Sequence, residues 1–361
     1  MKKKCLVGMS GGVDSSVAAA LLLDMGYDVE GLTITPFRID SSCEQKETEK
    51  SCCSAKSMQD ANRLCKQLGI KHHLIDFTES FKEQIVSKFA QDYFSGKTPN
   101  PCVLCNRLIK WEALLEAAEK YRCDLIATGH YAKINFNSQN QRYFISKGND
   151  PAKDQSYFLW KLSQEQLSKT IFPLANYQKS EIKEIANKLK LDIEKKPESQ
   201  EICFIPDNNY HNFLESSYPD VLNSIGKGDI IFNNQVIGQH KGFPFYTIGQ
   251  RKGLGISHPK PLYVKSIIAE KNIIVVDEID GLSSFSLIAS ELNFQKHIEV
   301  EQNKIYNVKI RYKDKGSPAR CSKEGQELLK IEFLESKKAI TPGQSVVVYE
   351  GDDLILGGII C

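Results

Sequence analysis

The sequence has no apolar run approaching the roughly 18–20 residues that cross a bilayer. Met1 to Lys4 is basic, as the start of a secretion signal is, but the apolar run that follows stops at Ser10 and is too short for a signal peptide. An excess of one charge is also missing, because 47 Lys and Arg stand against 45 Asp and Glu, a net charge of +2. No global field therefore indicates a nucleic-acid partner, and any basic surface must be local. We expect a cytoplasmic protein without membrane association.

A disordered or collagen-like composition is absent as well. Hydrophobic residues make up 41% and charged residues 25% of the 361 residues, which is ordinary for a globular chain. There is no internal repeat and no long low-complexity tract, and the polar stretch from Asp40 to Ser51 is predicted to be a mobile surface loop. The length predicts two or three domains, since a domain usually holds about 100–200 residues.

Cysteine, by contrast, is plentiful. The chain has 11 cysteines, an odd number without a secretion signal, which argues against a disulfide framework and favours thiol chemistry or metal ligation. Cys5, Cys65 and Cys123 lie in strand or helix patterns, so we predict that they are buried as small hydrophobic residues. Cys52 and Cys53 are adjacent rather than spaced as zinc ligands are, and either an incidental loop pair or a surface redox or metal role remains open.

Strand and helix patterns alternate through the first half of the chain. Strands are predicted at 5–7, 29–34, 73–77 and 124–128, and helices at 17–25, 55–68, 81–94, 106–121 and 181–191. Gly26 and Gly69 stand where two of these helices end. This alternation is typical of a Rossmann-like, doubly wound parallel sheet, in which ligands bind beyond the carboxyl ends of the strands.

The character of the sequence changes near Pro206. Helical patterns become fewer, glycines cluster from Gly226 to Gly255, and alternating strands at 306–312, 328–333 and 345–349 are typical of a small β-barrel. We predict three domains: an α/β catalytic domain over residues 1–205, a smaller, mainly β central domain over residues 206–280, and a C-terminal β-barrel over residues 281–361.

The turn after the first strand carries a phosphate-binding pattern. Residues 8–16 read GMSGGVDSS, and small residues there let backbone N–H groups approach an anion at a helix N-terminus. The turn lacks the lysine of a P-loop and the spacing of a dinucleotide fingerprint, so neither a kinase-type NTPase nor a nicotinamide enzyme fits. Its SGGVDS core resembles the loop of the ATP pyrophosphatases, which split ATP into AMP and pyrophosphate and use the AMP to activate an oxygen. A plain glycine-rich helix cap is the alternative, with Asp14 either handling magnesium or pyrophosphate or serving as a first-turn acid.

Two thiols, Cys102 and Cys105, stand three residues apart just before a predicted helix, in TPNPCVLCN at 98–106. A helix dipole lowers the pKa of a thiol at that end and favours the thiolate. The spacing alone is weak evidence for reactive thiols, because two cysteines at this spacing could also be half of a zinc site. Cys203 follows about a hundred residues later, in SQEICFIP at 199–206. Separated reactive thiols combined with an ATP pyrophosphatase loop suggest sulfur transfer.

The whole chain resembles the bacterial tRNA-specific 2-thiouridylase family. The matching segments run in family order from the first domain to the last, which is more specific than any one motif. They are GMSGGVDS at 8–15, TPNPxxxCN at 98–106, ATGHY at 127–131, KDQSYFL at 153–159, ICFI at 202–205, GQRKGLG at 249–255 and TPGQS at 341–345.

The resemblance implies a reaction and its residues. In that family ATP adenylates the 2-oxygen of the wobble uridine of tRNAs for Glu, Gln and Lys, and sulfur from a cysteine persulfide then gives 2-thiouridine. Cys203 would carry the persulfide, and Cys105 would be the nucleophile that forms a transient disulfide with it. A sulfur-donor or sulfur-relay protein is an expected partner.

The resemblance also implies the binding residues. ATP, with magnesium, would be bound by Gly8, Met9, Ser10, Gly11, Gly12, Val13, Asp14, Ser15, Ile34 and Gly129. The tRNA would be contacted by the target-base residues Asn100, Pro101 and Cys102, and by Lys153, Asp154, Gln155, Arg311 and Tyr312. Without the resemblance, Asp154 and Gln155 could equally be ordinary polar loop residues.

Cys102 departs from the family pattern, in which an Asp is common at this position. Either Cys102 replaces that Asp in positioning the base, or Cys102, Cys105 and Cys203 ligate an iron–sulfur cluster with one iron open to sulfide. The sequence leaves both interpretations open.

Local basic charge indicates where RNA could bind outside the active site. Between Asp229 and Glu270 there is no acidic residue, and basic and aromatic side chains interleave. This basic strip consists of Lys241, Arg251, Lys252, Lys260 and Lys265, with Phe243, Phe245, Tyr246 and Tyr263. The alternative is a solvated loop over core aromatic residues. A second basic stretch, from Lys309 to Arg320, is interrupted by Asp314.

Two rival functions remain at this point. Another ATP pyrophosphatase could thiolate or amidate a different acceptor, and a non-catalytic tRNA- or metal-binding protein could keep the loop as a relic. The paired thiols favour sulfur transfer over amidation.

Overall fold

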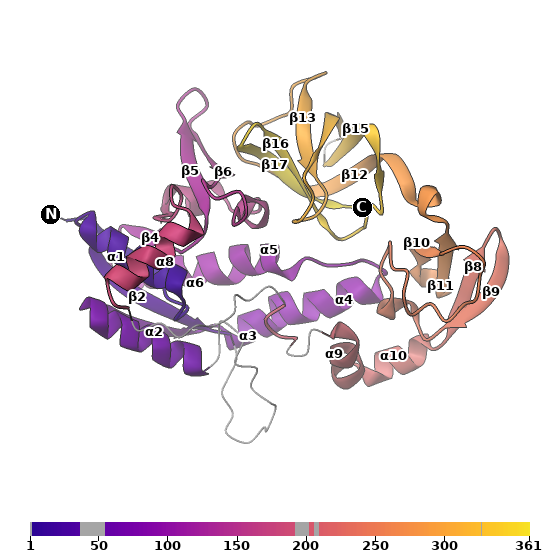
Figure 1. The fold of residues 1–361 in the computed structure, drawn as a ribbon, viewed down its shortest axis with the longest axis horizontal. Coiled ribbons are helices and arrows are strands. Elements are labelled where there is room, and N and C mark those ends of the chain that lie inside the picture. Colours follow the sequence, from indigo (N-terminus) through magenta and orange to yellow (C-terminus); the bar gives the residue numbers. More distant parts are fainter. Residues whose placement is uncertain (1, 37–54, 192–201, 206–208, 326) are drawn as a thin grey trace.

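The computed structural model describes residues 2–36, 55–191, 202–205, 209–325 and 327–361. The predicted loop at 40–51, the Cys52–Cys53 pair and the change of character near Pro206 lie outside these residues. Figure 1 shows the α/β domain at the left, the barrel above the centre and a small second sheet at the right. No helix in the described ranges has the length and apolar character needed to cross a membrane.

The N-terminal domain is built on a parallel sheet of five strands in the order β3-β2-β1-β4-β7. The strands are β1 (Lys4–Gly8), β2 (Asp28–Thr35), β3 (Lys71–Asp76), β4 (Leu125–Ala127) and β7 (Thr170–Ile171). The helices are α1 (Val13–Asp24), α2 (Ala55–Leu68), α3 (Thr78–Phe81), α4 (Lys88–Phe94), α5 (Pro101–Cys105), α6 (Glu112–Lys120), α7 (Gln164–Ser168) and α8 (Lys179–Lys188). The predicted doubly wound fold is confirmed.

Both faces of this sheet are buried under helices. Successive side chains of a strand point to opposite faces. Cys5 and Val7 accordingly pack with α1 and α2, whereas Leu6 packs with α6 on the other face. A strand covered on both sides reads as a continuous apolar run, which is the pattern the sequence shows.

Two long helical stretches lead from the sheet toward the other domains. The first runs through α3, the π-helical segment η1 (Lys82–Ser87) and α4, and the second through α5, the π-helical segment η2 (Asn106–Trp111) and α6. The second stretch begins five residues earlier than its predicted start at Asn106. Pro101 occupies the first helical position, where its fixed φ suits a helix and its missing N–H costs nothing. Cys102 and Cys105 therefore lie inside a helix, and the expectation that they precede it is wrong.

The alternation of strand and helix breaks after β4. Strands β5 (Ala132–Asn137) and β6 (Arg142–Lys147) form an antiparallel hairpin that the sequence did not predict. Asp353 of the barrel pairs with Ser146 of β6, so the hairpin extends the sheet of the barrel. The short helix η3 (Ser156–Leu159) follows the hairpin.

The C-terminal barrel is closed. It contains β12 (Ser283–Phe294), β13 (Ile305–Lys309), β14 (Ser317–Glu324), β15 (Leu328–Lys338), β16 (Ser345–Glu350) and β17 (Asp353–Ile360), and pairing between β12 and β17 completes the ring. Its interior is filled by alternate apolar side chains such as Val308, Ile331 and Val348. The barrel predicted from the strand pattern is confirmed.

The central part holds two helices and a four-stranded sheet. The helices are α9 (Tyr210–Ser217) and α10 (Pro219–Ile225). The strands are β8 (Gly228–Phe232), β9 (Gln235–His240), β10 (Tyr263–Ile268) and β11 (Ile273–Asp277), in the order β10-β11-β8-β9. The short helix η4 (Phe243–Phe245) follows β9.

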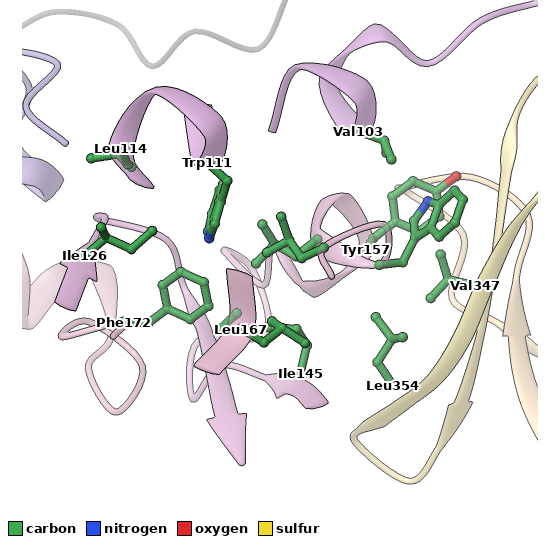
Figure 2. Packing of buried hydrophobic residues seen from close by; sticks show 14 of the residues in the cluster. Val103, Trp111, Leu114, Ile126, Ile145, Tyr157, Leu167, Phe172, Val347 and Leu354 are labelled. Atoms are coloured by element: carbon green, nitrogen blue, oxygen red, sulfur yellow. The ribbon is translucent and has the colours of Figure 1, made fainter. Parts of the chain in front are cut away.

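One apolar cluster joins the α/β domain to the barrel. Figure 2 shows Trp111 and Tyr157 of the first domain in the same packed layer as Val347 and Leu354 of the barrel. The Tyr157 hydroxyl donates to the backbone oxygen of Ser345 at 2.8 Å, in the same region. Because this core is continuous, the barrel is held in place against the helices that carry the thiols.

Candidate active site

The glycine-rich turn lies at the carboxyl end of β1. From β1 the chain first adds β2 and β3 on one side, and later adds β4 and β7 on the other. This is the point at which the strand order reverses, where open α/β sheets bind their ligands. Gly8 ends β1 on this edge, and Gly129 follows β4 on the same edge.

The conformation of the turn requires its small residues. Gly11 has φ +72°, and a Cβ there would lie 2.5 Å from the backbone oxygen of Ser57 in α2. The Ser10 N–H donates to Ser15 Oγ at 3.2 Å, and Ser15 Oγ donates to the Gly12 oxygen at 3.2 Å. Gly12 is the N-cap of α1 and has no side-chain oxygen to cap the first N–H groups of the helix. The first turn of α1 is therefore suited to an anion.

Gly129 packs directly on that first turn. A Cβ at Gly129 would lie 2.8 Å from the Asp14 carbonyl carbon and 2.9 Å from the Ser15 nitrogen. Ile34 lies near the end of β2. It is partly buried and packs against two apolar clusters, one that contains Trp111 and one that contains Phe81. The structure thus places both predicted nucleotide-side residues at the edge that carries the turn, while their contact with a nucleotide stays a prediction.

An ion pair that the sequence did not reveal lies beside the turn. Lys179 Nζ is 2.7 Å from both carboxylate oxygens of Asp14, and the Tyr131 hydroxyl donates to Asp14 Oδ1 at 2.6 Å. The Asp14 carboxylate is therefore engaged by two side chains of the protein. Lys179 stands 165 residues from Asp14 and begins α8, so no local pattern could have linked the two.

The two thiols proposed for catalysis pack on one apolar cluster. This thiol-side cluster consists of Phe81, Ile85 and Ile109, and both Cys105 and Cys203 lie against it, as does Ile34. Phe204, the neighbour of Cys203, makes an edge contact with the ring of Phe81, the two centroids lying 5.8 Å apart. Aromatic packing of this kind fixes the short segment 202–205 on the helices α3 and α4.

The described residues show no preformed ligand set for the iron–sulfur alternative, which stays a prediction. Cys102 is exposed, whereas Cys105 and Cys203 are half-buried against the thiol-side cluster. Across the described ranges, which include all three of these cysteines, no group of three His, Cys, Asp or Glu side chains is arranged to hold a metal ion.

The predicted tRNA contacts from three segments converge on η3. The side chains of Asn100 and Tyr157 share a hydrogen bond, and the ring of Tyr312 lies 4.6 Å from that of Phe158, centroid to centroid. Arg311 is exposed and donates to the backbone oxygen of Lys338 at 2.9 Å. Residues far apart in the chain therefore form one surface beside α5.

Asp154 and Gln155 have structural partners. Asp154 is buried, and its carboxylate accepts from the Gly148 and Ser156 N–H groups and from Ser156 Oγ. Gln155 Oε1 accepts from the Tyr131 N–H at 3.0 Å. Both side chains shape the turn before η3, and a direct contact of either with tRNA stays a prediction.

The positive charge of the basic strip in the central domain is smaller than its sequence suggests, because acidic side chains offset part of it. Acidic side chains from outside the strip pair with three of its lysines: Glu215 with Lys241, Glu278 with Lys260 and Asp277 with Lys265. Phe243, Phe245 and Tyr246 are buried in the core of this domain. For these aromatic residues the alternative of core packing is confirmed. All five basic residues of the strip are exposed, but Arg251 and Lys252 have no acidic partner among the described residues.

Family models match the chain in three consecutive parts. Residues 3–207 match a model described as tRNA methyl transferase HUP domain, residues 212–278 the tRNA methyl transferase PRC-barrel domain, and residues 284–360 the aminomethyltransferase beta-barrel domain. The chain is 44% identical, over 99% of its length and 94% of the relative's, to the tRNA-specific 2-thiouridylase MnmA of Salinibacter ruber. It is 45% identical, over 100% of its length and 96% of the relative's, to the tRNA-specific 2-thiouridylase MnmA of Amoebophilus asiaticus. This chain belongs to the tRNA-specific 2-thiouridylase family.

Membership in the 2-thiouridylase family confirms the resemblance seen in the motifs and the order of an α/β domain followed by two β domains. A solved structure of lower similarity is the U34-tRNA thiolase NcsA from Methanococcus maripaludis with its 4Fe-4S cluster. It is 20% identical, covers 61% of this chain and 67% of that chain, and has a TM-score of 0.34. A likeness this low does not bear on a cofactor of this chain.

Proposed function

We propose that this protein is an ATP-dependent tRNA-uridine 2-sulfurtransferase that converts the wobble uridine of tRNAs for Glu, Gln and Lys to 2-thiouridine. Membership in the 2-thiouridylase family supports the reaction class. The observation that carries the mechanism is the packing of Cys105 and Cys203 on one apolar cluster with Ile34, beside the edge that bears the phosphate-binding turn. Activation and sulfur transfer would then take place in adjacent parts of one site.

Activation is needed because the 2-oxygen of uracil is a poor leaving group. Transfer of AMP from ATP to that oxygen releases pyrophosphate and turns the oxygen into part of a phosphate ester, which a sulfur nucleophile can displace. The turn Gly8–Ser15 would hold the phosphates through backbone N–H groups and the dipole of α1. Ile34 and Gly129 would flank the nucleotide.

Sulfur transfer would use the two thiols in sequence. A sulfur-donor protein loads Cys203 as a persulfide. The Cys105 thiolate attacks Cys203 Sγ, the bond to the terminal sulfur breaks, and that sulfur leaves with the electron pair and attacks the uracil C2 as AMP departs. The products are 2-thiouridine, AMP and a Cys105–Cys203 disulfide, which a cellular thiol reductant must reduce before the next turnover. Such chemistry suits the reducing cytoplasm, where we place the protein.

The central domain, over residues 206–280, and the barrel would bind the body of the tRNA. Tyr312 of the barrel and Asn100, the N-cap of α5, both contact η3, the short helix that follows Lys153 to Gln155, which supports a shared contact with the anticodon region. Cys102 is exposed at the start of α5, where it would face the base in place of the family's Asp.

The test is mass spectrometry of nucleosides from unmodified tRNA after incubation with the protein, Mg-ATP and a persulfide donor. We expect 2-thiouridine with the wild type, and none above background with Cys105→Ala or Cys203→Ala. Cys123→Ala is the matched control, because Cys123 lies on the far side of the domain beside Lys4 and burial raises its pKa to about 11, so full activity is expected.

Two other outcomes separate the rival functions. Cleavage of ATP to AMP without thiouridine would retain the activation step and assign the enzyme a different acceptor. Binding of tRNA without ATP cleavage would contradict the proposed activity and favour a binding protein. Full activity of Cys105→Ala would overturn the role of that thiol.

A further inference from the structure

The strongest feature that the proposed function does not use is the ion pair beside the phosphate-binding turn. We propose that Lys179 is an ATP-phosphate ligand, the cation that the turn itself lacks, and that Asp14 and Tyr131 hold its ammonium group in place. The proposal rests on the proposed function in assuming that the turn binds ATP.

The turn has no cation of its own. Asp14 is the one charged residue in the stretch from Gly8 to Ser16, and it is acidic. ATP brings about four negative charges, and backbone N–H groups with a helix dipole of roughly half a charge offset only part of them. In P-loop proteins a lysine of the loop reaches the phosphates, and here no such lysine exists in the loop. A lysine from elsewhere in the fold can take that place.

The geometry brings Lys179 to the required position. Its ammonium lies 2.7 Å from both oxygens of Asp14, which belongs to the first turn of α1. Its side chain is only 12% exposed, and its backbone N–H donates to Asp150 Oδ2 at 2.9 Å. Helix α8 is packed on α1 through Ile182 against the apolar face of α1. The ammonium is therefore held at the end of α1 to which the phosphates would bind.

The position of Lys179 is electrostatically unfavourable for an ion pair whose role is only structural. Lys179 is the first residue of α8, and its ammonium sits beside the first turn of α1, so it faces the positive ends of two helix dipoles. Asp14 cancels the charge of Lys179, and the two helix ends leave the local potential positive. Such an arrangement is unfavourable for a lysine alone and favourable for a bound polyphosphate.

Tyr131 supports the same interpretation. Its hydroxyl donates to Asp14 Oδ1 at 2.6 Å, and its ring centroid lies 5.8 Å from the ammonium of Lys179. Tyr131 is itself buried, and its backbone is held by Gln155. The aspartate is thus fixed from one side, so that it orients the lysine toward the turn. A cation in that position would stabilise the charge that pyrophosphate gains as it leaves.

The experiment compares the binding of Mg-ATP and of adenosine by the full-length protein without tRNA, by isothermal titration calorimetry and ligand-observed NMR. For Lys179→Met we expect ATP binding to weaken about tenfold to a hundredfold, the range of a lost charge-assisted hydrogen bond. Adenosine binding should stay within about twofold, because adenosine has no phosphate. Lys179→Arg should recover part of the ATP affinity. Lys183→Met, on the exposed face of the same helix, is the matched control and should behave as the wild type.

Two results with Lys179→Met overturn the proposal. ATP affinity of Lys179→Met equal to that of the wild type removes the phosphate contact. Equal losses for ATP and adenosine, with a lower Tm, assign Lys179 a structural role only. If Lys179→Met fails to fold, Tyr131→Phe is the deciding variant, because it keeps the ring and removes the hydroxyl that fixes Asp14. Tyr131→Phe must then weaken the binding of ATP and leave the binding of adenosine unchanged. A wild type that binds no ATP contradicts the proposed function instead.

Discussion

At the scale of the residue, burial separates inert cysteines from accessible ones. Cys5 and Cys65 are fully buried, and burial raises the pKa of each thiol to about 12, so they remain neutral thiols at physiological pH. Their burial was predicted correctly from the strand and helix patterns, whereas Cys123, predicted to be buried as well, is only half-buried because it lies in the turn between α6 and β4. Cys105 and Cys203 are half-buried at the thiol-side cluster. A thiol must be accessible to form the thiolate that reacts, so the partial exposure of Cys105 and Cys203 is compatible with their proposed role in sulfur transfer.

His130 makes the stability of the protein dependent on pH. Burial, with a smaller effect of Lys110, lowers the pKa of His130 to about 3, against about 6.5 in an unfolded chain. The unfolded state therefore takes up a proton more readily than the folded state. The stabilising contribution is complete above pH 6.5 and is lost as the pH falls toward 3. We expect the Tm of the wild type to fall between pH 7 and pH 5, and to fall less in His130→Gln.

The control for this prediction is an exposed histidine. His258→Gln should keep the full decrease in Tm, because His258 is exposed. Differential scanning calorimetry at pH 7, 6 and 5 measures all three proteins. A His130→Gln variant with the same pH dependence as the wild type would show that His130 does not resist protonation.

At the scale of the element, a turn of the barrel contacts the residues before α5, the helix that carries Cys102 and Cys105. The Thr98 N–H donates to the Pro342 oxygen at 2.9 Å, and Gln344 Nε2 donates to the Thr98 oxygen at 2.9 Å. Gly343 lies between these contacts with φ +90°, and a Cβ there would be 2.9 Å from the Thr98 oxygen. The residues just before α5 are thus held from the barrel side.

Gly343→Ala should therefore slow thiolation more than it destabilises the fold. The left-handed φ alone costs an alanine about 1–2 kcal/mol. The close approach to Thr98 in addition displaces the start of α5, and a displacement near 1 Å can slow a reaction up to about a hundredfold. Urea unfolding and initial rates of thiouridine formation measure the two effects.

The control variant Gly351→Ala introduces the same kind of backbone strain without displacing the start of α5. Gly351 also has a positive φ, +59°, but a Cβ there would meet nothing within 4 Å. Gly351→Ala should lower the free energy of unfolding about as much as Gly343→Ala does, and it should leave the thiolation rate unchanged. Equal rates for the two variants would rule out a positioning role for the barrel turn.

At the scale of the whole molecule, charges from different domains decide where tRNA phosphates can bind. Lys260 and Lys265 are paired with Glu278 and Asp277, whereas Arg251 and Lys252 have no acidic partner in the part of the chain that the structure describes. For Arg251→Glu with Lys252→Glu, we expect weaker tRNA binding and a salt dependence shallower by about 1.4 to 1.8 in log–log slope, if two phosphate contacts are lost. Filter binding from 50 to about 200 mM salt measures this.

The paired lysines supply the control. Lys260→Gln with Lys265→Gln removes two positive charges whose fields Glu278 and Asp277 already offset, so the slope should change little. An unchanged affinity of the Arg251, Lys252 variant would remove the central strip from the tRNA footprint.

Local patterns in the sequence encode the main elements and the chemistry of the candidate site. Periodicity and glycine placement predicted the parallel sheet and the barrel, and short motifs marked the turn at Gly8–Ser15 and the thiols Cys105 and Cys203. Tertiary structure alone decided which distant residues meet. Three contacts depend on packing between distant parts of the chain. They are the ion pair of Asp14 with Lys179, the pairing of the β5–β6 hairpin with the barrel, and the hydrogen bond from Gln344 to Thr98. Local periodicity carries no information about such contacts, because burial of shared apolar faces brings them together only when the whole chain has folded.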